Sequence, residues 1–181
     1  LHAAYWTPNH PDGDADLRIM RCVLPHIQKP LSFLDMLATR RRHVLVEYQR
    51  IEWLIENGVW YGLHHDHVNY FLRSDFERNC NVVDGGEFAD GEWGWVLLEI
   101  DPSQSDSSGN STASMDAGSR EVDALWRGVA ELDRLRSHTI NRFRDDGRSV
   151  ILWGAAGKGI VAADTFIRSG IEILAAADAD R

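Results

Sequence analysis

The stretch that decides the fold is residues 15–48, ADLRIMRCVLPHIQKPLSFLDMLATRRRHVLVEY. Residues 15–22 are a short apolar run with the period of a β-strand, and residues 30–37 carry apolar side chains at helical spacing behind an initial proline. Residues 43–48 return to strand character. Because a strand, a helix and a second strand in this order form a parallel βαβ unit, the chain is predicted to have an α/β fold.

Further elements are expected in the first hundred residues. A short helix is predicted over residues 50–57, and another helix is predicted to begin with Ser74 as its N-cap and Glu77 as its capping-box partner. Two strands are predicted at residues 82–83 and 93–100. The connection between them is expected to run through Asp84-Gly85-Gly86 and Asp90-Gly91.

The second part of the chain has a different pattern. Residues 102–119 are rich in small polar residues and predict a flexible linker, whereas residues 120–146 carry one apolar stripe and predict a single long amphipathic helix. A second βαβ unit is expected to follow, with a strand at 149–153, a helix at 160–168 and a strand at 171–177. The expected organisation is therefore a first domain over 1–101, a linker over 102–119, and a long helix with the start of a second domain over 120–181.

Composition restricts the classes of partner. The chain has 181 residues, 44% of them hydrophobic, and a formal net charge of -9, which is typical of a globular protein and disfavours binding to nucleic acid or to anionic membranes. Two cysteines give no disulfide framework, and no apolar stretch is long enough to span a bilayer, so a cytoplasmic location is expected. Because the chain begins with leucine and its last predicted strand has no following element, we expect a fragment of a longer protein.

The segment GLHHDHVNYF, residues 62–71, concentrates groups that can transfer protons. One interpretation is a solvated loop whose Tyr70 and Phe71 dock on a core. A second is a zinc site with His65 and His67 as two ligands of one extended strand, although Cys22 and Cys80 stand too far apart in sequence to complete it in an obvious way. The third is catalysis, with a histidine as general base, and the motifs on either side favour it.

A glycine-rich turn, GAAGKG at residues 154–159, connects the predicted strand and helix of the second βαβ unit. Such a turn lets backbone amides approach a phosphate at a helix N-terminus. It is equally typical of a tight strand-to-helix connection. An acidic residue after the next strand, Asp178 or Asp180, stands about where a nucleotide fold would bind a ribose.

Three of these motifs occur together in the order found in a known family. The stretches VLPHI with PLSFL (residues 23–27 and 30–34), HDHVNYF (residues 65–71) and WGAAGKG (residues 153–159), with Val46-Glu47 and Trp53 between the first two, resemble motifs of class I S-adenosylmethionine-dependent methyltransferases of the sugar C-methyltransferase type. The resemblance runs from about residue 17 to the end. It implies the C-terminal half of a Rossmann-like methyltransferase domain, followed by the first βαβ unit of a second Rossmann-like domain.

The resemblance also implies a chemistry and a set of roles. S-adenosylmethionine would be the cofactor, and the acceptor would be a small molecule such as a nucleotide-linked sugar. His67 would be the general base, with Asp66 tuning it and Tyr70 bonding the substrate or an enolate oxygen. Cofactor contacts are expected at Cys22 and His26, and acceptor contacts at Gly154, Ala155, Gly157, Lys158 and Gly159. No metal is expected.

The chain also departs from the family pattern. Pro25 replaces a glutamate in the first motif, and Asp66 replaces a glutamate before His67. The glycine-rich cofactor loop and the zinc-binding segment of the family are not in the chain, so residues 1–181 are expected not to bind the cofactor tightly and to be inactive alone. Two other functions therefore stay open, a nicotinamide-binding or nucleotide-binding oxidoreductase module centred on the glycine turn and a truncated, non-catalytic remnant. Carbon, oxygen and nitrogen acceptors are all compatible with a histidine base.

Overall fold

The computed structural model describes residues 15–37, 42–100, 115–154 and 156–178. Residues 102–114 of the expected linker, together with Ala155 and Asp180, lie outside the described residues. Within the described part of the chain, no helix is both long enough and apolar enough to cross a membrane.

The contacts divide the chain into two compact units. The first comprises Leu1–Arg50 and Val68–Ala113, and the second comprises Ile51–His67 and Ser114–Arg181. The division differs from the expected one because residues 51–67, which include the histidines, group with the C-terminal part of the chain. The chain crosses from the second unit into the first between His67 and Val68.

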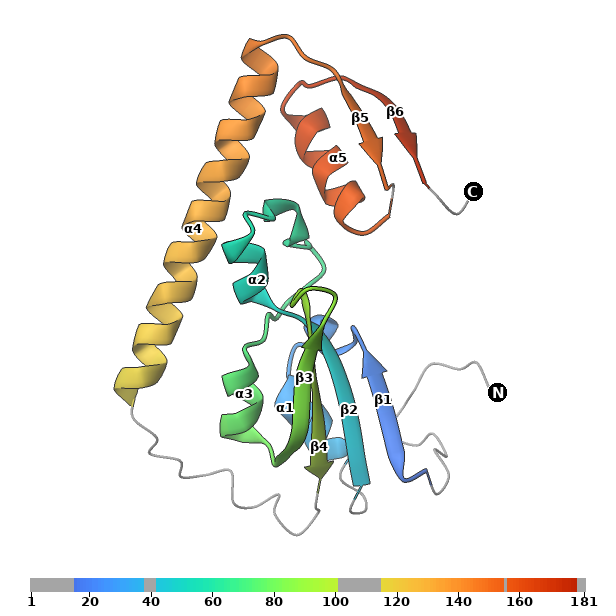
Figure 1. Cartoon of the computed structure of the whole chain (residues 1–181), viewed down its shortest axis with the longest axis vertical. Coiled ribbons are helices and arrows are strands. Elements are labelled where there is room, and N and C mark those ends of the chain that lie inside the picture. Colours follow the sequence, from blue (N-terminus) through green and yellow to red (C-terminus); the bar gives the residue numbers. More distant parts are fainter. Residues whose placement is uncertain (1–14, 38–41, 101–114, 155, 179–181) are drawn as a thin grey trace. The chain divides into compact units, whose positions relative to one another are not determined.

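The first unit is built on a mixed four-stranded sheet with the order β1-β2-β4-β3 (Figure 1). Its strands are β1 (Leu17–Arg21), β2 (Arg42–Gln49), β3 (Val82–Phe88) and β4 (Trp93–Ile100). Strands β1 and β2 are parallel and are joined through the 3-10 turn η1 (Leu24–His26) and helix α1 (Pro30–Met36), which confirms the predicted βαβ unit. Strand β4 runs antiparallel to β2 and to β3.

The hairpin connection between β3 and β4 was predicted wrongly in part. Asp84, Gly85 and Gly86 are not a turn but belong to β3, and the chain reverses at residues 89–92, where Ala89, Asp90 and Gly91 all have positive φ. A Cβ atom at Gly86 would come within 2.9 Å of the Trp95 indole nitrogen on the neighbouring strand. Gly86 therefore makes room for a cross-strand tryptophan, a role that the sequence pattern of a turn cannot distinguish.

The start of helix α3 (Arg73–Asn79) was also predicted wrongly. Its N-cap is Leu72, not Ser74, and the Asp75 carboxylate accepts a hydrogen bond of 2.8 Å from the Leu72 amide. Glu77, the expected capping partner, instead forms an ion pair of 2.7 Å with Arg73 at the previous turn. The acidic residue in the third helical position, which accepts the N-cap amide in a capping box, is therefore Asp75.

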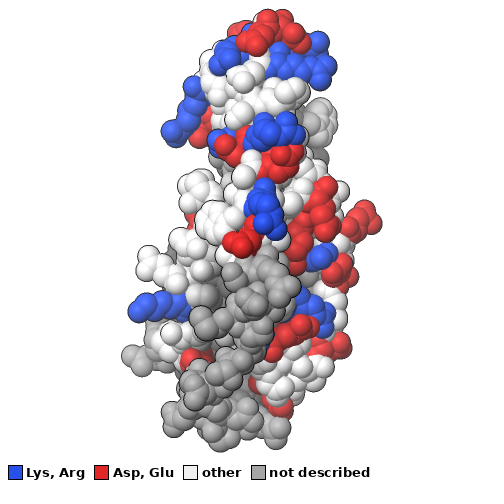
Figure 2. Space-filling model, turned by 90° about the vertical axis from the view of Figure 1, so that its left-hand side faces the viewer, with Lys and Arg blue, Asp and Glu red and all other residues white. Residues whose placement is uncertain are grey.

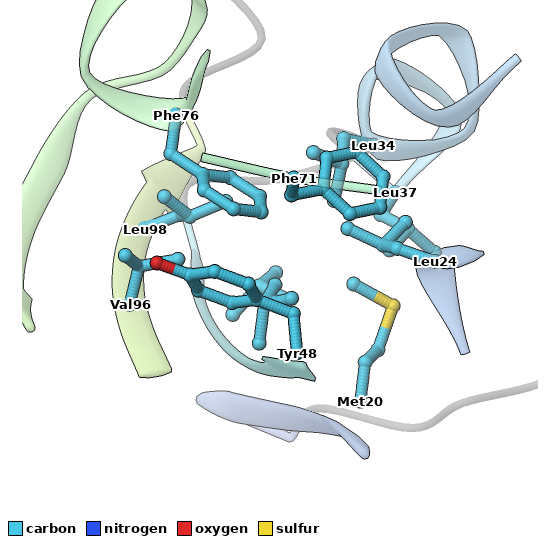
Figure 3. Packing of buried hydrophobic residues seen from close by; sticks show 11 residues of the cluster. Met20, Leu24, Leu34, Leu37, Tyr48, Phe71, Phe76, Val96 and Leu98 are labelled. Atoms are coloured by element: carbon cyan, nitrogen blue, oxygen red, sulfur yellow. The ribbon is translucent and has the colours of Figure 1, made fainter. Parts of the chain in front are cut away.

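The core of the first unit lies on one face of its sheet. Figure 3 shows side chains of the strands, among them Met20, Tyr48, Val96 and Leu98, packed against Leu24, Leu34, Leu37, Phe71 and Phe76 from η1, α1 and the α3 region. The Tyr48 ring lies 5.0 Å from that of Phe76, measured between centroids. Tyr48 faces Gly94 across the β2–β4 pair, and a Cβ atom at Gly94 would come within 2.6 Å of the tyrosine ring. A glycine is needed there because the ring occupies the space.

The second unit contains a βαβ motif and a long helix (Figure 1). Its elements are α2 (Ile51–Glu56), the 3-10 turn η2 (Trp60–Gly62), α4 (Met115–Asp145), β5 (Val150–Trp153), α5 (Lys158–Arg168) and β6 (Ile173–Ala177). Strands β5 and β6 are parallel, as predicted. Residues 115–119, expected in the linker, are helical, since extending an existing helix costs less than nucleating one and so tolerates weak helix formers at its end.

Helix α4 packs on α2 and η2 through only part of its predicted apolar stripe. Leu132 is fully buried, and a Cβ atom at Gly128 would come within 2.6 Å of the Ile55 side chain. In contrast, Val122 and Trp126 are exposed, although the stripe predicts them to be buried. Figure 2, in which this helix faces the viewer, shows acidic and basic side chains next to each other, in keeping with the ion pairs Glu131–Arg134 and Asp133–Arg136.

Candidate functional site

Cys22 follows β1 at the carboxyl ends of the two parallel strands, the edge at which open α/β sheets bind ligands. It has a φ of 54°, which is unusual for a residue other than glycine, and its amide donates a hydrogen bond of 3.2 Å to the Glu47 carbonyl of β2. Burial raises the pKa of the Cys22 thiol, partly offset by Arg21. A neutral thiol suits a contact residue and does not suit a nucleophile.

Gln49 is a buried polar residue at the carboxyl end of β2, and the sequence patterns did not reveal it. Its side chain is 4% exposed, and its amide nitrogen donates a hydrogen bond of 3.1 Å to Glu92. Within the described part of the chain, its oxygen Oε1 has no hydrogen-bond donor. A buried acceptor of this kind is costly unless a water molecule or a ligand satisfies it.

The first two motifs meet in the first unit although about forty residues separate them. The Pro25 carbonyl accepts hydrogen bonds from the amides of Val68 and Asn69, at 2.8 and 3.2 Å. The Asn69 side chain donates a further hydrogen bond of 2.5 Å to the Ile27 carbonyl. Asn69 therefore holds its own segment against the turn after β1. The sequence analysis did not assign it this role, although Asn69 stands within the quoted motif.

Two predicted site residues, His26 and Tyr70, are the chain neighbours of Pro25 and Asn69. His26 is the last residue of η1 and is exposed, so its imidazole is accessible to a ligand. Tyr70 is half-buried and precedes Phe71, which is buried in the core of the same unit. Pro25 itself is buried in η1, where it occupies an early helical position that favours proline. The start of η1 thus explains why proline is favoured at position 25, but a proline has no carboxylate that could bind a ligand.

The histidines form a turn in the second unit and not an extended strand. The His67 amide donates a hydrogen bond of 3.3 Å to the His64 carbonyl, with His65 and Asp66 at the two central positions. The rings of His64 and His67 stack with centroids 4.8 Å apart and planes inclined by 27°. His64 and His67 lie on the same side, because a turn returns its first and fourth residues to the same side.

The turn places the side chains of His64 and Asp66 close to His67. The Asp66 carboxylate is exposed, and its oxygen lies within 4.8 Å of a ring nitrogen of His67. The turn therefore brings together two imidazoles and a carboxylate, side-chain types that can take part in proton transfer.

The zinc interpretation requires His65 and His67 to share a site with a third ligand. His65 is exposed at the tip of the turn and belongs to no group of three neighbouring metal-ligating side chains among the described residues. Burial raises the pKa of Cys80 to about 11, and the thiol of Cys22 is shifted in the same direction.

The glycine turn of residues 154–159 is compact. Gly154 and Gly157 have positive φ, and a Cβ atom at Gly159 would collide with the Gly154 carbonyl. The amides of Gly159 and Ile160 donate to the carbonyls of Ala156 and Gly157, at 3.0 and 3.1 Å. The glycines at 154, 157 and 159 are thus needed for the tight turn itself. Among the described residues of this turn, Ala156 and Gly157 have backbone amides that could bind a ligand.

Two contacts bring the glycine turn to other functional candidates of the second unit. A Cβ atom at Gly157 would lie 3.8 Å from Cε1 of His64, so the imidazole ring of His64 lies beside the Gly157 backbone. The Lys158 ammonium group lies 5.5 Å from the centroid of the Trp53 ring, a cation–π arrangement. His64 and Trp53, which both stand in stretches of interest in the sequence, are thus neighbours of the predicted acceptor turn, a proximity that the sequence did not predict. Asp178, proposed as a ribose ligand, follows β6.

Comparison with known proteins gave no assignment. Neither a scan of protein-family models nor a search of curated proteins found a match to this chain.

Proposed function

We propose that this chain belongs to an S-adenosylmethionine-dependent methyltransferase that acts on a small molecule, such as a nucleotide-linked sugar, with a histidine as general base. The observation that carries the proposal is the junction at Pro25. There, the turn after β1 binds the backbone of Val68 and Asn69, so that two motifs of the resemblance lie side by side at the carboxyl end of a parallel strand pair. The mixed sheet is compatible with the implied methyltransferase fold.

The carboxyl edge of β1 and β2 offers features that fit the cofactor. The buried Oε1 atom of Gln49 has no hydrogen-bond donor among the described residues, and the hydroxyl or amino groups of an adenosine could supply one. Cys22 and His26 would make further contacts at the same edge. When bound, the cofactor supplies a methyl group that its sulfonium already activates.

The residues of the histidine turn would remove the proton from the acceptor. His67 takes that proton, and its stacking on His64 holds the ring in a fixed orientation. The nearby Asp66 carboxylate favours the charged form of the imidazole that results. Tyr70 would donate a hydrogen bond to the substrate or to the oxygen on which negative charge develops.

The glycine turn would hold the anionic part of the acceptor. The amides of Ala156 and Gly157 precede helix α5, whose dipole favours a negative group at its N-terminus. Lys158 adds a positive charge on the same turn, and Trp53 limits the positions of its ammonium group. The position of the His64 ring beside Gly157 would keep the base near the acceptor turn.

Titration of the isotope-labelled chain with S-adenosylhomocysteine and, in parallel, with NADH tests this proposal by NMR. Because the glycine-rich cofactor loop is not in the chain, we expect weak binding, in which S-adenosylhomocysteine at high concentration shifts the amide resonances of Cys22, His26 and Gln49 and a His26→Ala variant weakens those shifts. Shifts caused by NADH at residues 154–159 would favour the oxidoreductase alternative, for which the glycine turn of the second βαβ motif is the supporting feature. An absence of shifts with both ligands would contradict cofactor binding by this chain.

A further inference from the structure

The second unit contains a cavity of about 400 Å³ that none of the roles above uses. Its walls come from η2, α4 and α5, with Trp60, Leu63, Trp126, Leu132, Val161 and Thr165 among the lining residues. A volume of this size falls within the range of small-molecule sites in proteins. The cavity is therefore large enough for a molecule with one or two rings.

Two tryptophans give the cavity its character. The Trp60 side chain is 8% exposed and is held by edge-on contacts with Tyr61 and Phe166, with ring centroids 5.4 and 6.0 Å away. The Trp126 side chain is 68% exposed, although it stands on the stripe that α4 turns toward its neighbours. A large apolar ring that is exposed to water and also lines a cavity favours binding there, and aromatic partners gain more from such a ring than their buried area alone provides.

The polar side chains of the lining already have partners, which restricts the charge of the ligand. Thr165 donates its hydroxyl proton to the Val161 carbonyl in a hydrogen bond of 2.8 Å. Asp133 and Arg136 form an ion pair with each other, so the lining carries no net charge. A charged ligand would lose its hydration without gaining a counter-ion, whereas a neutral ligand would not.

We propose that this cavity binds a neutral aromatic molecule of one or two fused rings, which packs against the indole of Trp126. The site is distinct from the histidine turn and does not depend on methyl transfer. Its ligand is recognised by shape and by aromatic contact, since the polar lining groups mentioned above are engaged within the protein.

Indole serves as the probe, with cyclohexanol as a neutral, non-aromatic comparison, and binding is followed by saturation-transfer NMR and calorimetry. For a ligand of this size, we expect saturable binding of indole with a dissociation constant on the order of 10⁻⁵ to 10⁻³ M. Cyclohexanol should bind at least about tenfold more weakly, because it lacks the aromatic contact.

Two variants of exposed tryptophans locate the site. Trp126→Ala should weaken indole binding by about tenfold or more, while Trp153→Ala, which removes an 81% exposed tryptophan on β5 of the same unit, should leave it unchanged. Ala130→Phe, which fills the cavity from α4, should abolish binding while the circular dichroism spectrum stays the same. Absence of saturable indole binding, equal binding by the Trp126→Ala variant, or equal affinity for cyclohexanol would overturn the proposal.

Discussion

The two units contain the same motif, a parallel strand pair with a crossover helix, yet they bury it to very different extents. In the first unit, β2 lies between β1 and β4, and its residues Val44 and Val46 are fully buried. In the second unit, β5 pairs only with β6 among the described strands, and its residues Ile151 and Trp153 are 64% and 81% exposed. Similar apolar strand sequences thus acquire different surroundings.

This difference shows which part of a fold is local and which is not. The period of apolar residues and the flanking turn residues decide whether a segment is a strand or a helix. Burial depends on how many other elements pack against that segment, here η1, α1 and the α3 region for the first sheet. The first unit should therefore carry most of the stability that depends on core packing, and the second unit should carry more surface that is free to bind.

The largest expected effect tests the core of the first unit. Phe76 is 3% exposed and contacts the rings of Tyr48 and Phe71, so Phe76→Ala should lower the free energy of unfolding by about 3–5 kcal/mol. Phe88, on β3 of the same unit, is 38% exposed, and Phe88→Ala should cost less than about 1 kcal/mol. Urea denaturation of both variants gives the comparison. Equal losses would mean that the core is not confined to the face described above.

The next effect concerns the histidine turn. In a preparation active in methyl transfer, His67→Gln should lower kcat by about a hundredfold, or about 2.7 kcal/mol in activation free energy, because glutamine cannot take up the proton. His64→Gln should cost less, about tenfold, since it removes the stacked ring but leaves the base. His65→Gln serves as the control and should have little effect, because His65 is exposed at the tip of the turn. Single-turnover measurements that find an unimpaired His67→Gln variant would eliminate the base assignment.

The sequence predicted those features that depend on local patterns. The period of apolar residues predicted both βαβ motifs and the long helix, and clustered glycines predicted the place of the glycine turn. The positive φ angles of Gly154 and Gly157 are in keeping with that turn. The residue types of the candidate site were also recognisable, because histidine and carboxylate side chains can transfer protons in any fold. None of these predictions required knowledge of distant neighbours.

The features that were missed depend on tertiary contacts or on backbone geometry. Gly86 faces Trp95 on the next strand, so a glycine that is typical of a turn stands inside β3. The stacking of His64 on His67 requires the turn between them, and their sequence spacing fits several backbone conformations. Gln49 and Asn69 bond to partners more than forty residues away, which a single sequence does not reveal.

A smaller effect tests the corrected start of α3. Asp75→Ala removes the carboxylate that accepts the Leu72 amide, and we expect a loss of about 1 kcal/mol in the free energy of unfolding. Ser74→Ala should cost less than about 0.5 kcal/mol, since Ser74 is not the N-cap. Thermal unfolding of the two variants distinguishes the observed cap from the predicted one. A larger loss for Ser74→Ala would restore the original prediction.

The smallest expected effect tests the exposed face of the second unit. Because Trp153 is 81% exposed on β5, Trp153→Ser removes little buried area and should change the free energy of unfolding by less than about 0.5 kcal/mol. The corresponding change in the first unit, Val46→Ser on β2, places a hydroxyl among fully buried side chains and should be strongly destabilising. Urea denaturation at two protein concentrations provides the measurement. If Trp153→Ser were as destabilising as Val46→Ser, or if its effect grew with concentration, the β5 face would be covered in solution, and the two strand pairs would be alike in burial after all.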